Sequence, residues 1–144
     1  MNTKLLTLLT MGLFSFLFSS RGDEPNNIET KEQTALRQAA DRKTIKALRN
    51  AGADLSKPHT LEHHFITYER AKADAVIADP LAAGYKVSEI AILKDENGKP
   101  YFYFDLIKTI VPDEKTIFAE SLRMTTLEKK HGVLFDGWGC SVEK

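Results

Sequence analysis

The strongest constraint on the fold is a stretch past the middle of the chain, residues 101–107, in which residue types alternate strictly. Phe102, Phe104 and Leu106 share one side of this predicted strand, and Tyr101, Tyr103 and Asp105 share the other. Side chains alternate between the two faces along a strand. The pattern therefore predicts a sheet whose phenylalanine face packs on a core and whose tyrosine face is the best candidate for an open surface.

The segments around this strand set the order of the elements. Asn97-Gly98 is typical of a tight hairpin and joins the strand to an earlier one over residues 86–94. A further strand is predicted over residues 59–68. It is followed by a helix over residues 69–83, with a kink at Pro80 because proline cannot donate a backbone hydrogen bond.

A last helix and a last strand complete the chain. The helix begins at Pro112-Asp-Glu114 and ends at Gly132, and the strand continues to Val142. The order strand-helix-strand-strand-helix-strand predicts an α+β, ferredoxin-like (βαββαβ) fold. This fold is a four-stranded antiparallel sheet with two helices on one face.

An extra helix is expected before this unit. Residues 29–51 are good helix formers with apolar residues at helical spacing, and Gly52 suits a left-handed cap. Asp41 is a candidate break within this helix, because aspartate favours caps over helix interiors.

The last strand holds the only Trp and the only Cys of the chain. Gly137 and Gly139 flank Trp138, which indicates a bulge or close packing on the indole ring. Strict alternation places Trp138 on the side opposite Phe135. A single Cys cannot form an internal disulfide, and we expect Cys140 to be buried as a small apolar residue.

Residues 1–22 have the layout of a secretory signal peptide. Lys4 precedes an apolar run over residues 5–18, and small residues, Ser20 and Gly22, occupy the −3 and −1 positions of a cleavage site. The run is shorter than the roughly 20 residues of a spanning helix, although an uncleaved N-terminal anchor is an alternative. We expect export to the periplasm or medium with cleavage near Gly22, a linker over residues 23–28, and one domain over residues 29–144 without membrane contact.

The charge of the chain is balanced, with 20 basic and 20 acidic residues. The predicted leader contains Lys4, Arg21 and no acidic residue, so 18 basic and 20 acidic residues remain after cleavage, a net charge of −2. Nucleic acid and anionic membranes are bound through concentrated positive charge. The composition therefore argues against both as partners.

Three histidines and a glutamate lie close together at residues 59–64 and invite a metal hypothesis. His63 and His64 are adjacent, so they point to opposite faces of a strand, and only Glu62 and His64 can converge. Structural zinc usually takes four ligands. We therefore expect no bound metal or cofactor, with one histidine partly buried and hydrogen-bonded and the other exposed.

Three segments carry a resemblance to a known family. Gly52-Ala-Asp-Leu-Ser-Lys-Pro58 precedes Thr60-Leu-Glu-His-His-Phe65, Ala82-Ala-Gly-Tyr85 precedes a strand, and Phe135-Asp-Gly-Trp-Gly139 lies near the end. In this order and spacing, residues 28–142 resemble the regulator of ribonuclease E activity B (RraB) family.

The resemblance implies a ferredoxin-like fold and a non-enzymatic activity, namely binding and inhibition of the endoribonuclease ribonuclease E. It implies a structural motif made of Glu62, His63, His64, Asp136, Gly137 and Trp138. The inhibitor type of the family is strongly acidic and its ribonuclease is cytoplasmic, whereas this chain is nearly neutral and carries an export signal. A different, unknown protein target is therefore expected.

The first functional expectation is a regulatory module that binds a protein through Tyr101, Tyr103 and Asp105, with Glu62 and His64 beside them. The extra helix, or a second copy of the chain in a homodimer, is an alternative cover for this face. A small enzyme or thiol protein is a second functional class, with Cys140, Glu62, His63, His64 and Asp136 as its chemistry. Nucleic-acid binding through Tyr101 and Tyr103 as stacking aromatics is a third.

Overall fold

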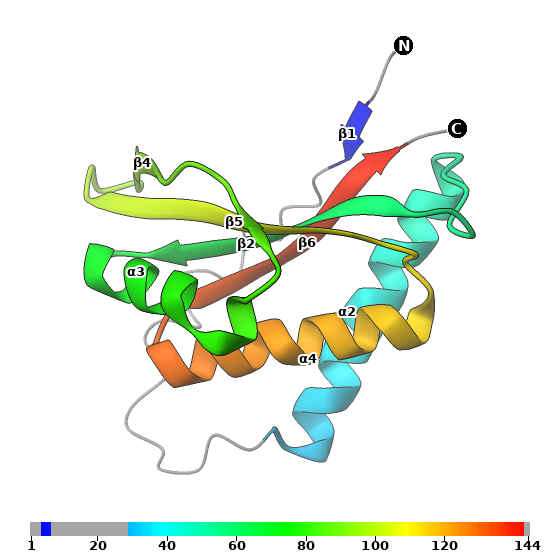
Figure 1. Cartoon of the computed structure of the whole chain (residues 1–144), viewed down its shortest axis with the longest axis horizontal. Helices are drawn as coiled ribbons and strands as arrows, with labels where there is room; N and C mark the ends of the chain where they lie inside the picture. Colours follow the sequence, from blue (N-terminus) through cyan, green and yellow to red (C-terminus); the bar gives the residue numbers. More distant parts are fainter. Residues whose placement is uncertain (1–3, 7–28, 143–144) are drawn as a thin grey trace.

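A computed structural model describes residues 4–6 and 29–142 (Figure 1). Its helices are α2 (Lys31–Asn50), α3 (Arg70–Ala78), the 3-10 helix η2 (Pro80–Ala82) and α4 (Glu114–His131). Its strands are β1 (Lys4–Leu6), β2 (His59–Thr67), β3 (Lys86–Val87), β4 (Ala91–Lys94), β5 (Pro100–Ile110) and β6 (Leu134–Val142). No helix among the described residues is both long and apolar enough to cross a membrane.

The described strands form one sheet in the order β1-β6-β2-β5-β3, with β4 also paired to β5, and every pairing is antiparallel. The order β6-β2-β5 followed by β3 and β4 is that of a ferredoxin-like sheet, so the predicted fold class is confirmed. The strand predicted over residues 86–94 is interrupted between β3 and β4.

β1 adds a short edge strand beside β6. Lys4–Leu6 falls within the predicted signal peptide. The remainder of that segment and the predicted linker over residues 23–28 lie outside the described residues.

The helices pack on one side of the sheet (Figure 1). One part of the core joins α3 and α4 to β2 and β5, and its fully buried members include Phe65, Val76, Phe104, Leu106, Met124 and Leu127. A second part joins α2 and α4 to β2 and β6 through Leu48, Leu61, Ile117, Trp138 and Cys140. The predicted core role of the phenylalanine side of β5 and the burial of Cys140 are both confirmed.

The extra N-terminal helix, α2, is continuous. It starts at a capping box in which Thr30 and Gln33 each bond the other's backbone N–H. The break proposed at Asp41 is wrong, because this carboxylate is buried and accepts hydrogen bonds from Trp138 Nε1, at 3.1 Å, and from the Ser121 hydroxyl. With tertiary donors available, Asp41 does not compete for the helix backbone.

β6 contains the predicted bulge. Phe65 pairs with Phe135 and His63 with Trp138, so two steps along β2 match three steps along β6. Gly137 lies at the extra residue with φ +87°, a conformation that favours glycine. The bulge resets the alternation, and Trp138 packs on the helix side together with Phe135. The expectation that these two aromatic rings lie on opposite sides is therefore wrong.

The helix predicted over residues 69–83 is interrupted at the proline, as expected. α3 ends at Ala78, and η2 begins at Pro80 with the Asp79 side chain accepting a hydrogen bond from the backbone N–H of Leu81. The 3-10 turn leads into β3, on the far side of β5 from β2.

Candidate functional site: the polar cluster on the sheet face opposite the helices

The sheet face opposite the helices carries a compact group of polar side chains. We call it the polar cluster: Glu62 and His64 from β2, Tyr103 and Asp105 from β5, and Asp136 from β6. The β2–β5 register sets His64 directly opposite Asp105. The bulge in β6 lies opposite His64 and brings Asp136 into electrostatic interaction with both His64 and Tyr103.

His64 is the centre of the cluster. Its Nδ1 lies 2.6 Å from Asp105 Oδ1 and 2.7 Å from the hydroxyl of Tyr103. The Tyr103 ring stacks on the imidazole, with centroids 5.8 Å apart. Asp105 is held in turn by Ser88, whose hydroxyl oxygen accepts from the Asp105 backbone N–H at 2.7 Å and whose N–H donates to the Asp105 carbonyl. These bonds restrict the orientation of the imidazole ring.

The cluster carries more carboxylates than cations. Burial raises the pKa of Asp136 to about 6, against the attraction of His64. Burial and then the neighbouring charge of Asp105 raise the pKa of Glu62, and the same two causes raise that of the Tyr103 hydroxyl. Among the ion pairs of the described residues, none joins a Lys or Arg to Glu62, Asp105 or Asp136, and His64 is the basic partner of Asp105.

The structure brings together four of the five predicted partner-binding residues and sets one apart. Tyr103, Asp105, Glu62 and His64 belong to the polar cluster. Tyr101 lies further along β5, where its ring meets Tyr68 edge-on at 6.3 Å and its register partner is Leu93 of β4.

The three histidines of β2 point to different partners. His59 Nε2 lies 2.7 Å from the backbone carbonyl of Asp54, and His63 Nε2 lies 3.2 Å from Glu120 Oε2 under α4. His63 and His64 are both buried and both hydrogen-bonded, so the expectation of one exposed histidine is wrong. Their placement on opposite faces is confirmed.

His63 belongs to a separate buried network on the helix side. Glu120 accepts hydrogen bonds from Tyr85 and His63, and Lys108 Nζ lies 3.9 Å from its second carboxylate oxygen. Burial raises the pKa of Glu120, but the His63 and Tyr85 bonds outweigh it, and the net shift is downward. This arrangement satisfies a buried carboxylate and makes it part of the core.

The residues considered for enzyme chemistry do not converge. Cys140 and His63 lie on the helix-covered side, Cys140 fully buried against the second part of the core. Glu62, His64 and Asp136 lie on the opposite side. A nucleophilic thiol needs a base within hydrogen-bond reach, and the sheet separates Cys140 from His64.

Two polar core residues were not found from the sequence. Asp41 pairs with Trp138, and Glu120 pairs with His63 and Tyr85. The sequence offers only a general indication of such residues, since a buried Trp, Tyr or His needs a polar partner. Which acidic residue supplies that partner depends on helix packing, which local pattern does not reveal.

The fold and the site together define the class of the protein: a small ferredoxin-like α+β module with polar networks on both sheet faces. The chain belongs to the family described as Regulator of ribonuclease activity B (RraB), whose model matches residues 38–140. The resemblance proposed from the sequence is thus confirmed.

Curated relatives of the same name are similar over most of their length. The protein from Actinobacillus succinogenes is 36% identical over 106 residues, which are 74% of this chain and 75% of that protein. The protein from Haemophilus influenzae is 34% identical over 106 residues, 74% of this chain and 69% of that protein. Both are named Regulator of ribonuclease activity B.

Proposed function

We propose that this chain is a non-enzymatic regulator that acts by binding another protein. The observation that carries the proposal is membership of a family whose curated members are named regulators of ribonuclease activity. The placement of Cys140 on the face of the sheet opposite His64 supports it, because a nucleophilic thiol needs a base within hydrogen-bond reach.

The proposed contact surface is the tyrosine side of β5 with its neighbours. Tyr101 is half-buried, and its cross-strand partner Leu93 is 44% exposed. Together they form an accessible aromatic and aliphatic patch of the kind that anchors protein interfaces. Tyr103, Asp105, Glu62 and His64 extend this side toward the sheet centre. α2 packs with α4 on the other side, so the extra helix is not its cover.

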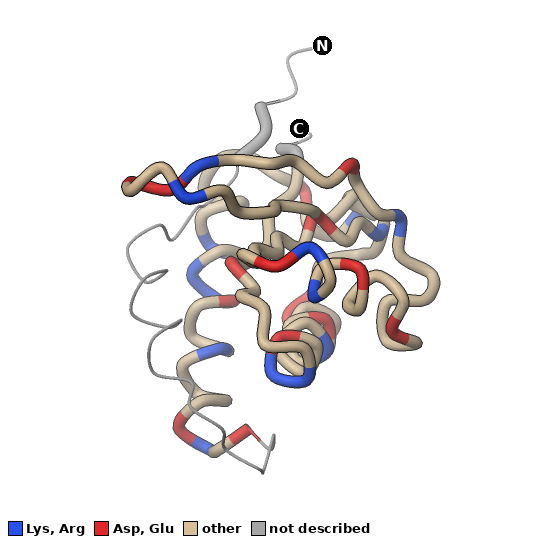
Figure 2. The backbone as a smooth tube through the Cα atoms, turned by 90° about the vertical axis from the view of Figure 1, so that its left-hand side faces the viewer, with Lys and Arg blue, Asp and Glu red and all other residues tan. Residues whose placement is uncertain are grey.

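Nucleic-acid binding is the weaker candidate. Figure 2 shows basic and acidic residues interspersed along the backbone, and the sequence holds 20 of each. The strand aromatics alone resemble a stacking platform, but Tyr103 is stacked on His64.

The test is a regulation assay with matched surface variants. Purified chain is added to an endoribonuclease, with ribonuclease E as the first choice from the resemblance, and RNA cleavage and complex formation are measured. Tyr101→Ala with Leu93→Ala is expected to weaken binding at least tenfold with unchanged folding. Leu36→Ala, at an exposed position of α2, is the control and is expected to bind normally.

Two results would count against this surface. If the double variant binds like the parent, the contact lies elsewhere. If it instead falls from dimer to monomer in sedimentation, the patch joins two copies of the chain. A chain that neither binds nor slows a ribonuclease would leave the family's named activity unsupported for this member.

We also propose that the chain is exported, on the basis of the predicted signal peptide. The mature N-terminus of the protein from fractionated cells tests this, with Asp23 expected after cleavage near Gly22. Full-length protein in the cytosol would overturn export and make a cytoplasmic ribonuclease the natural target.

A further inference from the structure

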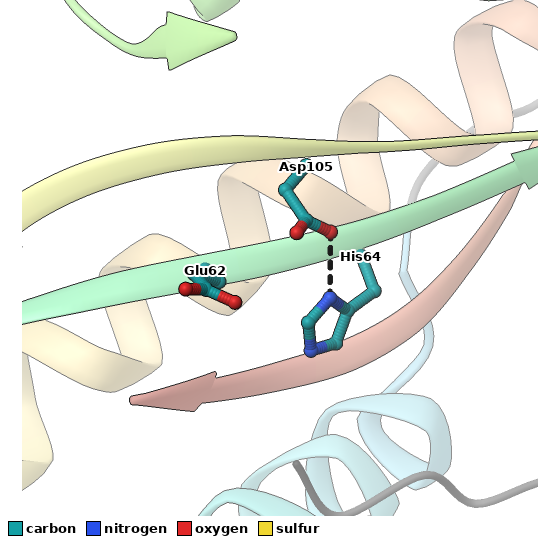
Figure 3. Close-up of side chains that lie close together, drawn as sticks. All are labelled: Glu62, His64 and Asp105. Carbon is teal, nitrogen blue, oxygen red and sulfur yellow. Dashed lines mark hydrogen bonds and ion pairs between the residues drawn. The ribbon is translucent and has the colours of Figure 1, made fainter. Parts of the chain in front are cut away.

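Three potential metal ligands in the polar cluster lie unusually close together. Glu62 and His64 come from β2 and Asp105 from β5, and one ligand atom from each lies within 4.8 Å of the other two. Figure 3 shows the three side chains close together, with one ring nitrogen of His64 turned toward Asp105 and the Glu62 carboxylate to one side of the pair. Zinc–ligand bonds of roughly 2.0–2.2 Å put tetrahedral ligands about 3.4 Å apart, so modest side-chain rotation closes the remaining gap.

An unsatisfied nitrogen of His64 points independently to a ligand. His64 is 1% exposed, and its Nε2 is a buried atom without a hydrogen-bond partner in the described part of the chain. When Nδ1–H donates to Asp105, Nε2 carries a free lone pair. A buried, unpaired polar atom is costly. A carboxylate on one imidazole nitrogen with the other left available is the usual arrangement of a metal-binding histidine.

The surrounding charge favours a cation. Glu62, Asp105 and Asp136 place three carboxyl groups around one imidazole, and the described residues supply no Lys or Arg partner to any of them. In the pairing of β2 with β6, Glu62 lies opposite Gly139. Gly139 has no side chain, which leaves space for an ion beside the Glu62 carboxylate.

We propose that Glu62 and the Nε2 atom of His64 bind a divalent transition-metal ion, with zinc as the first choice, while Asp105 orients the imidazole through Nδ1. One imidazole with carboxylate oxygens suits zinc, manganese or cobalt better than a soft thiolate-seeking ion. The sequence-based expectation of no metal counted only Glu62 and His64, because the pairing of β2 with β5, which supplies Asp105, was not known. The site lies within the proposed partner surface, but the zinc titration is made without a partner, so the two proposals can fail separately.

The test uses the full-length chain, stripped with a chelator and titrated calorimetrically with zinc chloride. One zinc ion per chain is expected, together with a rise in the thermal midpoint. Cobalt in place of zinc is expected to give a visible absorption band with an imidazole and oxygen ligand set. Asp105→Asn, which alters the group that orients His64 through Nδ1, is expected to lower zinc affinity about 10–100-fold.

Glu62→Gln is the cleanest variant, because Glu62 is only half-buried and the change preserves shape. It is expected to lose at least about tenfold in affinity with an unchanged fold. Glu96→Gln in the exposed hairpin and Cys140→Ser on the other face are the controls and are expected to bind zinc like the parent. No zinc binding by the parent, or equal binding by Glu62→Gln, His64→Asn and the parent, would overturn the site.

Discussion

At the scale of single residues, buried polar partners explain side chains that look unfavourable in the sequence. Asp41 lies within a helix and is buried, but it receives hydrogen bonds from Trp138 and Ser121. Burial raises the pKa of Asp41, and these two bonds oppose the shift. Trp138 joins α2, α4 and β6 because its ring fills the core and its N–H reaches across to Asp41.

Trp138→Ala is expected to lower the free energy of unfolding by about 3–5 kcal/mol, as large aromatic truncations in cores do. Trp138→Phe keeps much of the packing and leaves Asp41 without one donor, so a smaller loss of about 1–3 kcal/mol is expected. Urea denaturation at neutral pH measures both. An alanine variant with an unchanged midpoint would show that the indole is not a core anchor.

At the scale of elements, bulges and caps determine where a strand or helix ends and which way its side chains point. The β6 bulge depends on Gly137, where an added Cβ would meet nothing within 4 Å. Glycine is therefore required there by its positive φ and not by space. The bulge both turns Trp138 toward the helices and brings Asp136 beside His64.

Gly137→Ala is expected to cost about 1–2 kcal/mol of stability, because a Cβ disfavours this conformation. Gly137→Asn is the matched control and is expected to cost less, since asparagine tolerates positive φ. Thermal unfolding of both variants checks the order. Equal losses would indicate that the side chain, and not the backbone angle, matters at this position.

Asp79 connects η2 to the end of α4. Its Oδ2 lies 2.7 Å from both Lys130 Nζ and His131 Nε2. The Lys130 bond and the Leu81 N–H hold the pKa of Asp79 far below its usual range. A lowered folded pKa stabilises the native state above the unfolded value near 4, and this stabilisation is lost as the pH falls below it.

Asp79→Asn keeps an oxygen for the cap and removes the charge. The variant is expected to be less stable than the parent by about 1 kcal/mol at pH 7. The difference is expected to shrink as the pH falls below about 4, because Asp79 then takes up a proton in the unfolded chain and the stability of the parent falls toward that of the variant. Chemical denaturation from pH 7 to pH 2 measures it; a difference that does not vary with pH would contradict the ion-pair explanation.

At the scale of the whole molecule, the sheet can be divided into a ferredoxin-like unit and an added edge. β1 contributes three paired residues beside β6, and the unit from α2 to β6 contains both parts of the core. Cleavage near Gly22 would remove β1 and leave β6 as the edge strand.

A chain beginning at Asp23 is therefore expected to fold cooperatively, within about 1–2 kcal/mol of the full-length protein, as three edge pairs at a few tenths to 1 kcal/mol each suggest. Circular dichroism and Trp138 fluorescence compare the two chains. A shortened chain that fails to fold would mean that the domain requires residues 1–22.

The sequence by itself determined the order of the elements and the two faces of β5, because alternation and turn signals act within a few residues. It also indicated the bulge beside Trp138. Only the tertiary structure decided that Asp105 faces His64, that Trp138 meets Asp41, and that the three histidines of β2 separate. These pairings depend on strand register and helix packing. A one-residue shift, such as the extra residue at Gly137, moves every later side chain to the other face of the sheet.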